Sequence, residues 1–289
     1  MTRYRGHAVA MAMLLAAASV AVQGQRVDWN ERSPWKGRTN GGPSQARKEP
    51  FKIFDEVYYV GLQTVSAFLV DAGDGLVLID STFAETPDLV LDSVRRLGFN
   101  PANIKYILVT HSHADHYGGA AKIKQVSGAR VGMSADDWKE VERDSGAHLT
   151  RDLVLKEGEP LTVGKMTFKF YLTPGHTPGA TSIEYQVHDR GAAYRALSPG
   201  GLGLNYGPEW NAAYIKSMER LKALGPWDTV LTNHPFLAPI PLFDVEKALK
   251  TRGQGPNPAL MGKESIIAWM DGALKTAREK QAAEGPATR

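Results

Sequence analysis

The feature that most restricts what this 289-residue chain can fold into is a run of four potential metal ligands within six residues, His111-Ser112-His113-Ala114-Asp115-His116. The run follows the apolar residues 106–109, which predict a buried strand. Side chains two apart in an extended backbone lie on the same side, so His111 and His113 can reach one metal ion. Asp115 and His116 follow where the chain turns and can face a second ion. Burying four ionisable groups together without a counter-ion would be costly, so the run predicts metal binding.

Two further histidines can complete such a site. His176 lies in a stiff turn rich in Pro and Gly, residues 173–179, after a predicted strand. His234 follows the predicted strand 229–231. Either histidine alone is as consistent with an ordinary loop residue as with a ligand. Together they supply the ligands that two ions need.

Composition limits the chemistry. The chain has no cysteine, which excludes a disulfide framework, a thiolate metal site, an iron–sulfur cluster and a cysteine nucleophile. Any metal must therefore be held by imidazole and carboxylate groups. Lys and Arg number 34 against 31 Asp and Glu, and this net charge of +3 is too small to indicate a nucleic-acid-binding surface. We expect no nucleic-acid partner.

The N-terminus predicts export. Residues 1–24 combine Arg3 and Arg5, an uncharged apolar run and a small-residue end, which is the pattern of a signal peptide cleaved near Ala21 or Gly24. The run is short for a membrane span, which needs about 20 residues. An uncleaved amphipathic anchor is the alternative. We expect a periplasmic or secreted monomer without a stable membrane anchor.

The remaining chain predicts one domain. Residues 25–50 form a polar N-terminal arm, and residues 51–289 form the body. Strands, a helix, a strand and a helix are followed by a second series of the same kind. This order favours two mixed halves packed sheet to sheet with helices outside, which is an α+β fold, although a doubly wound sheet is the alternative. The expected strands are 51–60, 66–70, 76–80, 106–109, two strands around Gly164 within 161–172, 181–187, 192–197 and 229–231. The expected helices are 86–97, 116–126, 211–224 and one around 266–274.

The motifs resemble the metallo-β-lactamase superfamily. The His-x-His-x-Asp-His run, the Pro-Gly-His-Thr turn at His176 and the late His234 occur in the family's order, and Leu78-Ile79-Asp80 is similar to its upstream strand end. The resemblance implies the four-layer αβ/βα sandwich with metals at the sheet edge. It is closest to the cysteine-free third subclass of zinc β-lactamases (class B, subclass 3), which residues 50–51, 58–61 and 255–258 also resemble.

The resemblance also implies roles for these residues. It places two Zn2+ per chain, with a zinc-bound hydroxide as the nucleophile, and Asp115 as the catalytic residue that orients this hydroxide. Asp80 is either a partner of a metal ligand or a strand-end cap. The implied ligands are His111, His113 and His176 for one zinc, and Asp115, His116 and His234 for the other.

The resemblance implies a small-molecule substrate, a penicillin, cephalosporin or carbapenem, whose β-lactam amide is hydrolysed. The role that it implies is antibiotic resistance. Superfamily hydrolases such as glyoxalase II carry a bridging aspartate that residues 194–198 lack, which disfavours phosphodiesterase and thioester hydrolase activity. Ser198 is the candidate contact for the substrate carboxylate, with Asn205 and Tyr206 as alternatives, or it caps a turn. Another hydrolase of this fold, such as an acyl-homoserine lactonase, is the alternative function, and a non-catalytic metal-binding protein is a third.

Overall fold

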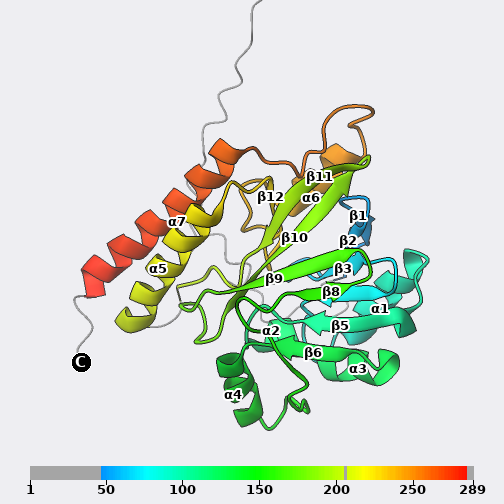
Figure 1. The fold of residues 1–289 in the computed structure, drawn as a ribbon, viewed down its shortest axis with the longest axis horizontal. Coiled ribbons are helices and arrows are strands. Elements are labelled where there is room, and N and C mark those ends of the chain that lie inside the picture. The colour runs from blue at the N-terminus through cyan, green and yellow to red at the C-terminus, as the bar shows by residue number, and fades with distance from the viewer. Residues whose placement is uncertain (1–46, 205–206, 285–289) are drawn as a thin grey trace, which may run out of the picture.

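The computed structural model describes residues 47–204 and 207–284, whose strands form two sheets with helices on their outer faces (Figure 1). The predicted signal peptide 1–24 and most of the arm 25–50 lie outside the described residues. Within the described part of the chain, no helix is long and apolar enough to cross a membrane.

The first sheet has seven strands that follow one another in sequence order. Its first four strands are antiparallel, and a hairpin at Asp74-Gly75 joins two of them. The later strands are parallel, so helices must cross over between them. The strands are β1 (Phe51–Lys52), β2 (Val57–Tyr59), β3 (Phe68–Asp71), β4 (Leu76–Ile79), β5 (Ile104–Leu108), β6 (Arg130–Met133) and β7 (Leu153–Val154), and the connecting helices are α1 (Pro87–Arg96), η2 (Pro101–Asn103), α2 (Ala114–Tyr117), α3 (Ala120–Ser127) and α4 (Ala135–Arg143).

The second sheet has five strands in the order β12-β11-β10-β9-β8. Four of its strands form antiparallel hairpins, and β12 joins β11 in parallel. Its elements are β8 (Leu161–Val163), β9 (Met166–Leu172), β10 (Thr181–Asp189), β11 (Ala192–Ser198) and β12 (Thr229–Val230), with helices α5 (Pro208–Leu224), α6 (Leu242–Leu249) and α7 (Lys263–Glu284).

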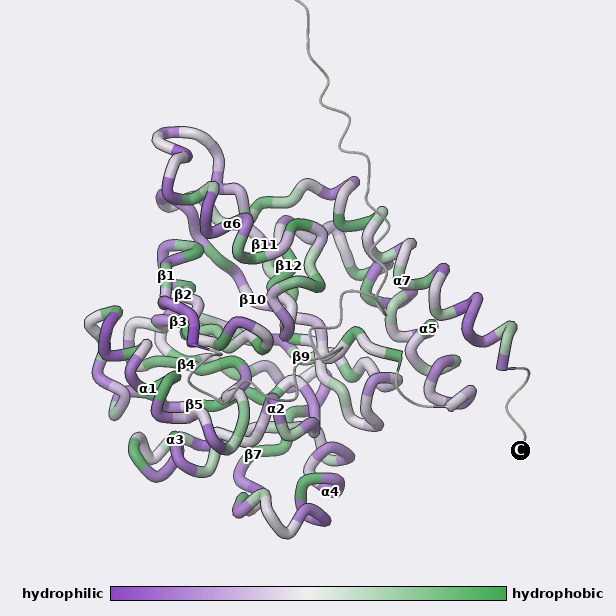
Figure 2. Tube along the Cα trace, turned by 180° about the vertical axis from the view of Figure 1, so that it is seen from behind, coloured by the Kyte–Doolittle hydropathy of each residue, from purple (hydrophilic) through white to green (hydrophobic). Residues whose placement is uncertain are grey.

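Three apolar clusters hold four layers together. The central cluster lies between the sheets and contains residues of both, among them Phe68, Val77, Phe168 and Tyr185. A second cluster packs α1, α3 and α4 on the first sheet, and a third packs α5 and α7 on the second. In Figure 2 the inner strands β4 and β5 are largely hydrophobic, whereas the outer helices carry hydrophilic stretches. The αβ/βα sandwich is therefore confirmed, and two separate sheets replace the doubly wound alternative.

The helix expected over 116–126 is interrupted where the backbone N–H of Gly119 donates to the carbonyl oxygen of Thr82, at 3.0 Å, instead of continuing the helical ladder, and at this point two glycines pass very close to other backbone. A Cβ on Gly118 would lie 2.5 Å from the nitrogen of Ala84, and one on Gly119 would lie 2.2 Å from the oxygen of Ser81. The chain therefore ends α2 early and begins α3 at Ala120. Strands β6 and β7 and helices α4 and α6 were not predicted from the sequence.

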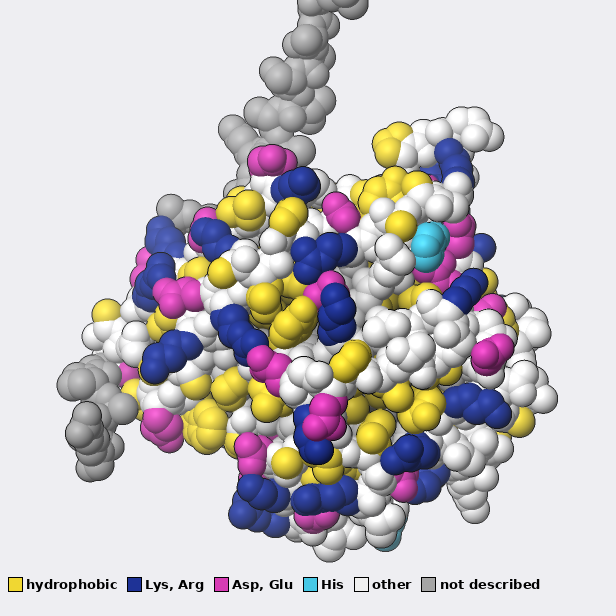
Figure 3. All heavy atoms as spheres, viewed as in Figure 1, with side chains coloured by type: hydrophobic (Ala, Val, Ile, Leu, Met, Phe, Trp, Pro, Cys, Tyr) yellow, Lys and Arg dark blue, Asp and Glu magenta, His cyan; other side chains and the backbone are white. Residues whose placement is uncertain are grey.

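Charged side chains of both signs are interspersed over the face shown in Figure 3, with apolar side chains between them. Many of them form surface ion pairs, such as Arg220 with Glu157. Exposed pairs of this kind contribute little to stability, so we expect the apolar layers to dominate it.

The central layer generates a stability prediction. Phe168 is fully buried between the sheets, whereas the Val126 side chain on α3 is 40% exposed. We expect Phe168→Ala to lower the free energy of unfolding by about 3–5 kcal/mol, because the cavity cannot close fully. Urea unfolding at a fixed chelator concentration measures this, with Val126→Ala as the control. Equal losses in the two variants would contradict the proposed dominance of the central layer.

Candidate metal centre

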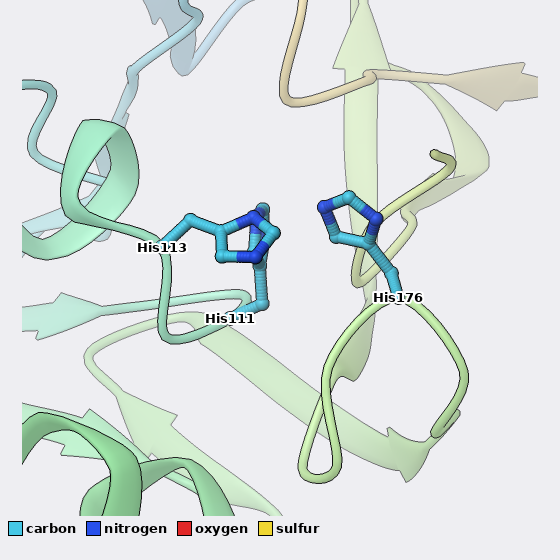
Figure 4. Close-up of side chains that lie close together, drawn as sticks. All are labelled: His111, His113 and His176. Carbon is cyan, nitrogen blue, oxygen red and sulfur yellow. The ribbon is translucent and has the colours of Figure 1, made fainter. Parts of the chain in front are cut away.

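The first group of candidate ligands joins the two sheets. His111 and His113 lie in the loop after β5, and His176 lies in the loop between β9 and β10. One ligand atom from each lies within 4.8 Å of the others. The ring of His176 is centred 4.6 Å from each of the other two rings, and Figure 4 shows the three side chains converging. Residues from different sheets thus present nitrogen atoms to one point.

The second group lies beside the first. Asp115 and His116 belong to the short helix α2, and His234 follows β12; their ligand atoms also lie within 4.8 Å of one another. Asp115 Oδ2 is 3.3 Å from His116 Nε2 and 3.8 Å from His234 Nε2. The His116 ring is centred 4.1 Å from that of His111 in the first group. The six predicted residues therefore form two adjacent groups of three.

Hydrogen bonds behind the rings determine which nitrogen faces the centre. His176 Nδ1 lies 2.7 Å from the carbonyl oxygen of Gly203, and His234 Nδ1 lies 2.8 Å from that of Thr64. His116 Nδ1 lies 3.0 Å from Asp80 Oδ2. Because carbonyl and carboxylate oxygens only accept, each Nδ1 carries a proton and donates it. The Nε2 atoms are left to face the centre, as in histidine ligands of metal sites.

The donor set fits a metal ion. His111 Nε2 and His116 Nε2 are buried and make no well-formed hydrogen bond among the described residues, although Asp115, a member of the same group as His116, lies 3.3 Å from His116 Nε2. Buried polar atoms without partners are uncommon in folded proteins, so these two call for a ligand. Imidazole nitrogen and carboxylate oxygen are ligands that zinc accepts. Both groups are therefore suited to hold zinc.

Asp80 connects the two groups. This residue has a positive φ of 58° and accepts hydrogen bonds from the backbone N–H and the hydroxyl of Thr110, at 2.8 and 2.9 Å. Because that hydroxyl donates to Asp80, it accepts from His111 Nδ1, 3.1 Å away. Asp80 thus orients His116 directly and His111 through Thr110. Its contacts are consistent with both interpretations of its role, since it bonds to the candidate ligand His116 and to Thr110 at the end of another strand.

Burial keeps most of the imidazoles neutral, which is the form that binds metal. Burial and the neighbouring histidines lower the pKa of His111 well below its usual value and that of His176 to about 3. Burial, with His116 nearby, lowers the pKa of His234 to about 4. Burial would also lower the pKa of His116, but Asp115 and Asp80 outweigh it and raise this pKa to about 10. The two carboxylates beside His116 thus favour its protonated form, in contrast to the other imidazoles.

The glycine-rich segment 200–203, to which no role was assigned from the sequence, packs against the ring of His176 and accepts a hydrogen bond from it. A Cβ on Gly201 would come within 2.3 Å of His176 Cδ2, and Gly201 has a φ of 141°. The next glycine, Gly203, supplies the carbonyl oxygen that accepts from His176 Nδ1. The cluster of glycines just after the end of β11 is the sequence feature from which this close approach could have been predicted.

Ser198 lies apart from these contacts. Its side chain is 1% exposed, and its Oγ is 3.0 Å from the hydroxyl of Tyr185, which belongs to the central core. Contact between Ser198 and substrate stays a prediction, and this hydrogen bond favours a structural role. The alternatives Asn205 and Tyr206 lie outside the described residues.

Comparison with known sequences identifies relatives. The sequence model of the metallo-beta-lactamase superfamily matches residues 60–232. A hydroxyacylglutathione hydrolase of Cereibacter sphaeroides is 31% identical over 178 residues, which cover 60% of this chain and 63% of that protein. The probable metallo-hydrolase YybB of Bacillus subtilis is 28% identical over 44% of this chain and 58% of its own length. Each match thus spans less than two thirds of the relative.

Solved structures match over more of the chain. BJP-1, a subclass B3 metallo-beta-lactamase of Bradyrhizobium japonicum, aligns with a TM-score of 0.73 and 26% identity over 83% of this chain and 95% of that one. FEZ-1 of Legionella gormanii aligns with a TM-score of 0.73 and 25% identity over 82% and 98%. The family match covers more than half of the sequence, and the structural matches extend the likeness across both sheets. This chain belongs to the metallo-beta-lactamase superfamily.

Proposed function

We propose that the protein is a zinc-dependent β-lactamase that opens the β-lactam amide of penicillins, cephalosporins or carbapenems. The observation that carries the proposal is the pair of metal groups, which contain five imidazoles and the single carboxylate of Asp115. The structural likeness to subclass B3 metallo-beta-lactamases supports it.

The sequence relatives named hydroxyacylglutathione hydrolase favour a different substrate, a thioester. Glyoxalase II carries a bridging aspartate after the turn that matches His176. In this chain the end of β11 offers Ala196, Leu197 and Ser198, and Asp115 is the one carboxylate in the metal groups found among the described residues. This difference favours a lactam over a thioester.

The proposed ligands are divided between two zinc ions: His111, His113 and His176 hold one, and Asp115, His116 and His234 hold the other. The chemistry that such a pair supplies when bound is polarisation of a carbonyl and activation of water at neutral pH.

The burial pattern indicates where substrate enters. His111, His116 and His176 are buried, whereas His113, Asp115 and His234 are only half-buried. The half-buried residues thus line the open side, from which a carbonyl carbon can approach. His111 and His116, held from behind by Thr110 and Asp80, form the floor.

Asp115 is suited to orient the attacking water. Burial would raise the pKa of this carboxyl, but His116 and the other nearby histidines outweigh that effect and hold it well below the usual range. The side chain therefore stays ionised at neutral pH and accepts hydrogen bonds. Its half-buried position lets it accept from a water molecule on the substrate side while it faces His116 and His234.

We also propose that the protein is exported, because the pattern of residues 1–24 is that of a signal peptide. A periplasmic or secreted enzyme meets β-lactams outside the cytoplasm, which suits a role in antibiotic resistance. Fractionation of a Gram-negative host that expresses the full chain tests this, and retention in the cytoplasm would contradict it.

The substrate assignment predicts a distinct activity profile. We expect the purified protein to hydrolyse nitrocefin and a carbapenem, and to lose this activity with a chelator and regain it with zinc. An acyl-homoserine lactone and a hydroxyacylglutathione thioester complete the panel. Efficient turnover of the lactone or the thioester without turnover of any β-lactam would overturn the β-lactamase proposal.

The ligand assignment predicts two zinc ions per chain. We expect His234→Ala to lose mainly the ion of the second group and His111→Ala mainly that of the first. Metal analysis after dialysis measures the content, and His148→Ala, at an exposed position outside both groups, is the matched control. A single ion in fully loaded wild-type protein would contradict the assignment.

Ser198→Ala separates the two roles of this serine. Because its hydroxyl bonds to Tyr185, we expect a loss of about 1 kcal/mol in the free energy of unfolding and little change in KM. Steady-state kinetics and urea unfolding measure the two quantities. A rise in KM of roughly tenfold at unchanged zinc content, the scale of a lost charged hydrogen bond, would instead identify a substrate contact.

A further inference from the structure

Asp137 is a buried carboxylate that contacts both loops of the first metal group without touching a ligand. Its side chain, on helix α4, is 1% exposed. Oδ2 accepts from the backbone N–H of Ser112 at 2.9 Å and from the hydroxyl of Thr177 at 2.9 Å. Oδ1 accepts from the backbone N–H of Gly179 at 2.8 Å. One side chain thus receives three hydrogen bonds from two loops.

The donors to Asp137 lie next to candidate metal ligands in the sequence. Ser112 lies between the two histidines that follow β5, and Thr177 directly follows His176. The two loops leave different sheets, β5 from the first and β9 from the second. Asp137 therefore fixes the distance between the halves of a site that neither sheet forms alone.

The surroundings are built to hold this carboxylate. Gly179 approaches so closely that a Cβ there would lie 2.0 Å from Ser134 Oγ and 2.9 Å from Asp137 Oδ1. Ser134 caps α4 by accepting from the backbone N–H of Asp137, which places the carboxylate in the first helical turn. The N-terminus of a helix stabilises negative charge. Burial raises the pKa of Asp137 to about 6, even though hydrogen bonds from Thr177, Gly179 and Ser112 oppose this shift.

We propose that Asp137 is a positioning residue for the first metal group: it holds the loop of His111 and His113 against the loop of His176 and so increases the affinity of these three histidines for zinc. The inference rests on the proposed zinc binding. The second group is arranged differently, because Asp80 contacts its ligand His116 directly. Asp137 reaches the first group through Ser112, Thr177 and Gly179 of its two loops, so its loss is expected to act on one site and not on both.

Asp137→Asn tests this role with little change in volume. An amide has one accepting oxygen, so one of the loop donors faces an NH2 group and loses its partner. We expect the Kd of the first zinc to rise by about tenfold, the lower end for residues that support metal ligands, with the second zinc unaffected. Titration of the metal-free full chain against a chromophoric chelator measures both constants, and the His111→Ala and His234→Ala variants assign the two phases.

Two comparisons control for general damage. Asp136→Asn changes the neighbouring carboxylate, which pairs with Lys139 on the surface, and is expected to leave both zinc constants unchanged. Thr177→Val removes one donor at almost constant volume, whereas Thr177→Ser keeps the hydroxyl. We expect Thr177→Val to weaken the first zinc and Thr177→Ser to restore it, so this pair decides the question even if Asp137→Asn does not fold. The Co2+ absorption spectrum of the first site is expected to change in the same two weakened variants.

The outcomes separate this inference from the proposed function. Two zinc ions in wild type with an unchanged first constant in both Asp137→Asn and Thr177→Val would overturn the positioning role alone. Equal weakening of both sites, together with a lower melting temperature of the metal-free protein, would show that Asp137 only stabilises the fold. A wild-type protein that binds no zinc would overturn the positioning role and the proposed function together.

Discussion

The packing of two sheets face to face is the constraint on which the rest of the structure depends. The central apolar cluster fixes the sheets against each other, and the loops at one edge come into contact as a result. His176 meets His111 only because β9 and β5 belong to sheets held in this way. The candidate metal centre therefore depends on the core, since a hydrophobic interior with little freedom to rearrange transmits its geometry to the edge.

Polar contacts then refine what the core provides. Asp80 links one histidine of each group, and the carbonyl groups of Thr64 and Gly203 hold two more rings. Each of these acceptors leaves an Nε2 atom facing inward. These buried hydrogen bonds thus orient the imidazole rings. The buried Nε2 atoms of His111 and His116 at the floor of the centre indicate that a ligand completes it.

Much of this arrangement could be predicted from the sequence. Four of the six candidate ligands lie within residues 111–116, and His176 lies in a turn, residues 173–179, that contains Pro and Gly. The apolar strands and the long helices α1 and α5 were also recognisable from their periodicity. Helix α4 was missed, although Ser134 begins it as an N-cap, because its nine residues carry only a short apolar stripe at Trp138 and Val141. The role of Asp137 could not be predicted, since it depends on contacts with loops 25 and 40 residues away.

The scarcity of carboxylates in the two groups has an electrostatic consequence. Asp115 is the single acidic ligand, so a pair of divalent ions held there would keep an excess of positive charge that Asp80, behind the floor, offsets only in part. A positive electrostatic potential at the opening of the centre would attract anions over a Debye length, about 8 Å at physiological ionic strength. Carboxylated molecules would be drawn in faster than neutral ones, and simple inorganic anions would compete with them for entry.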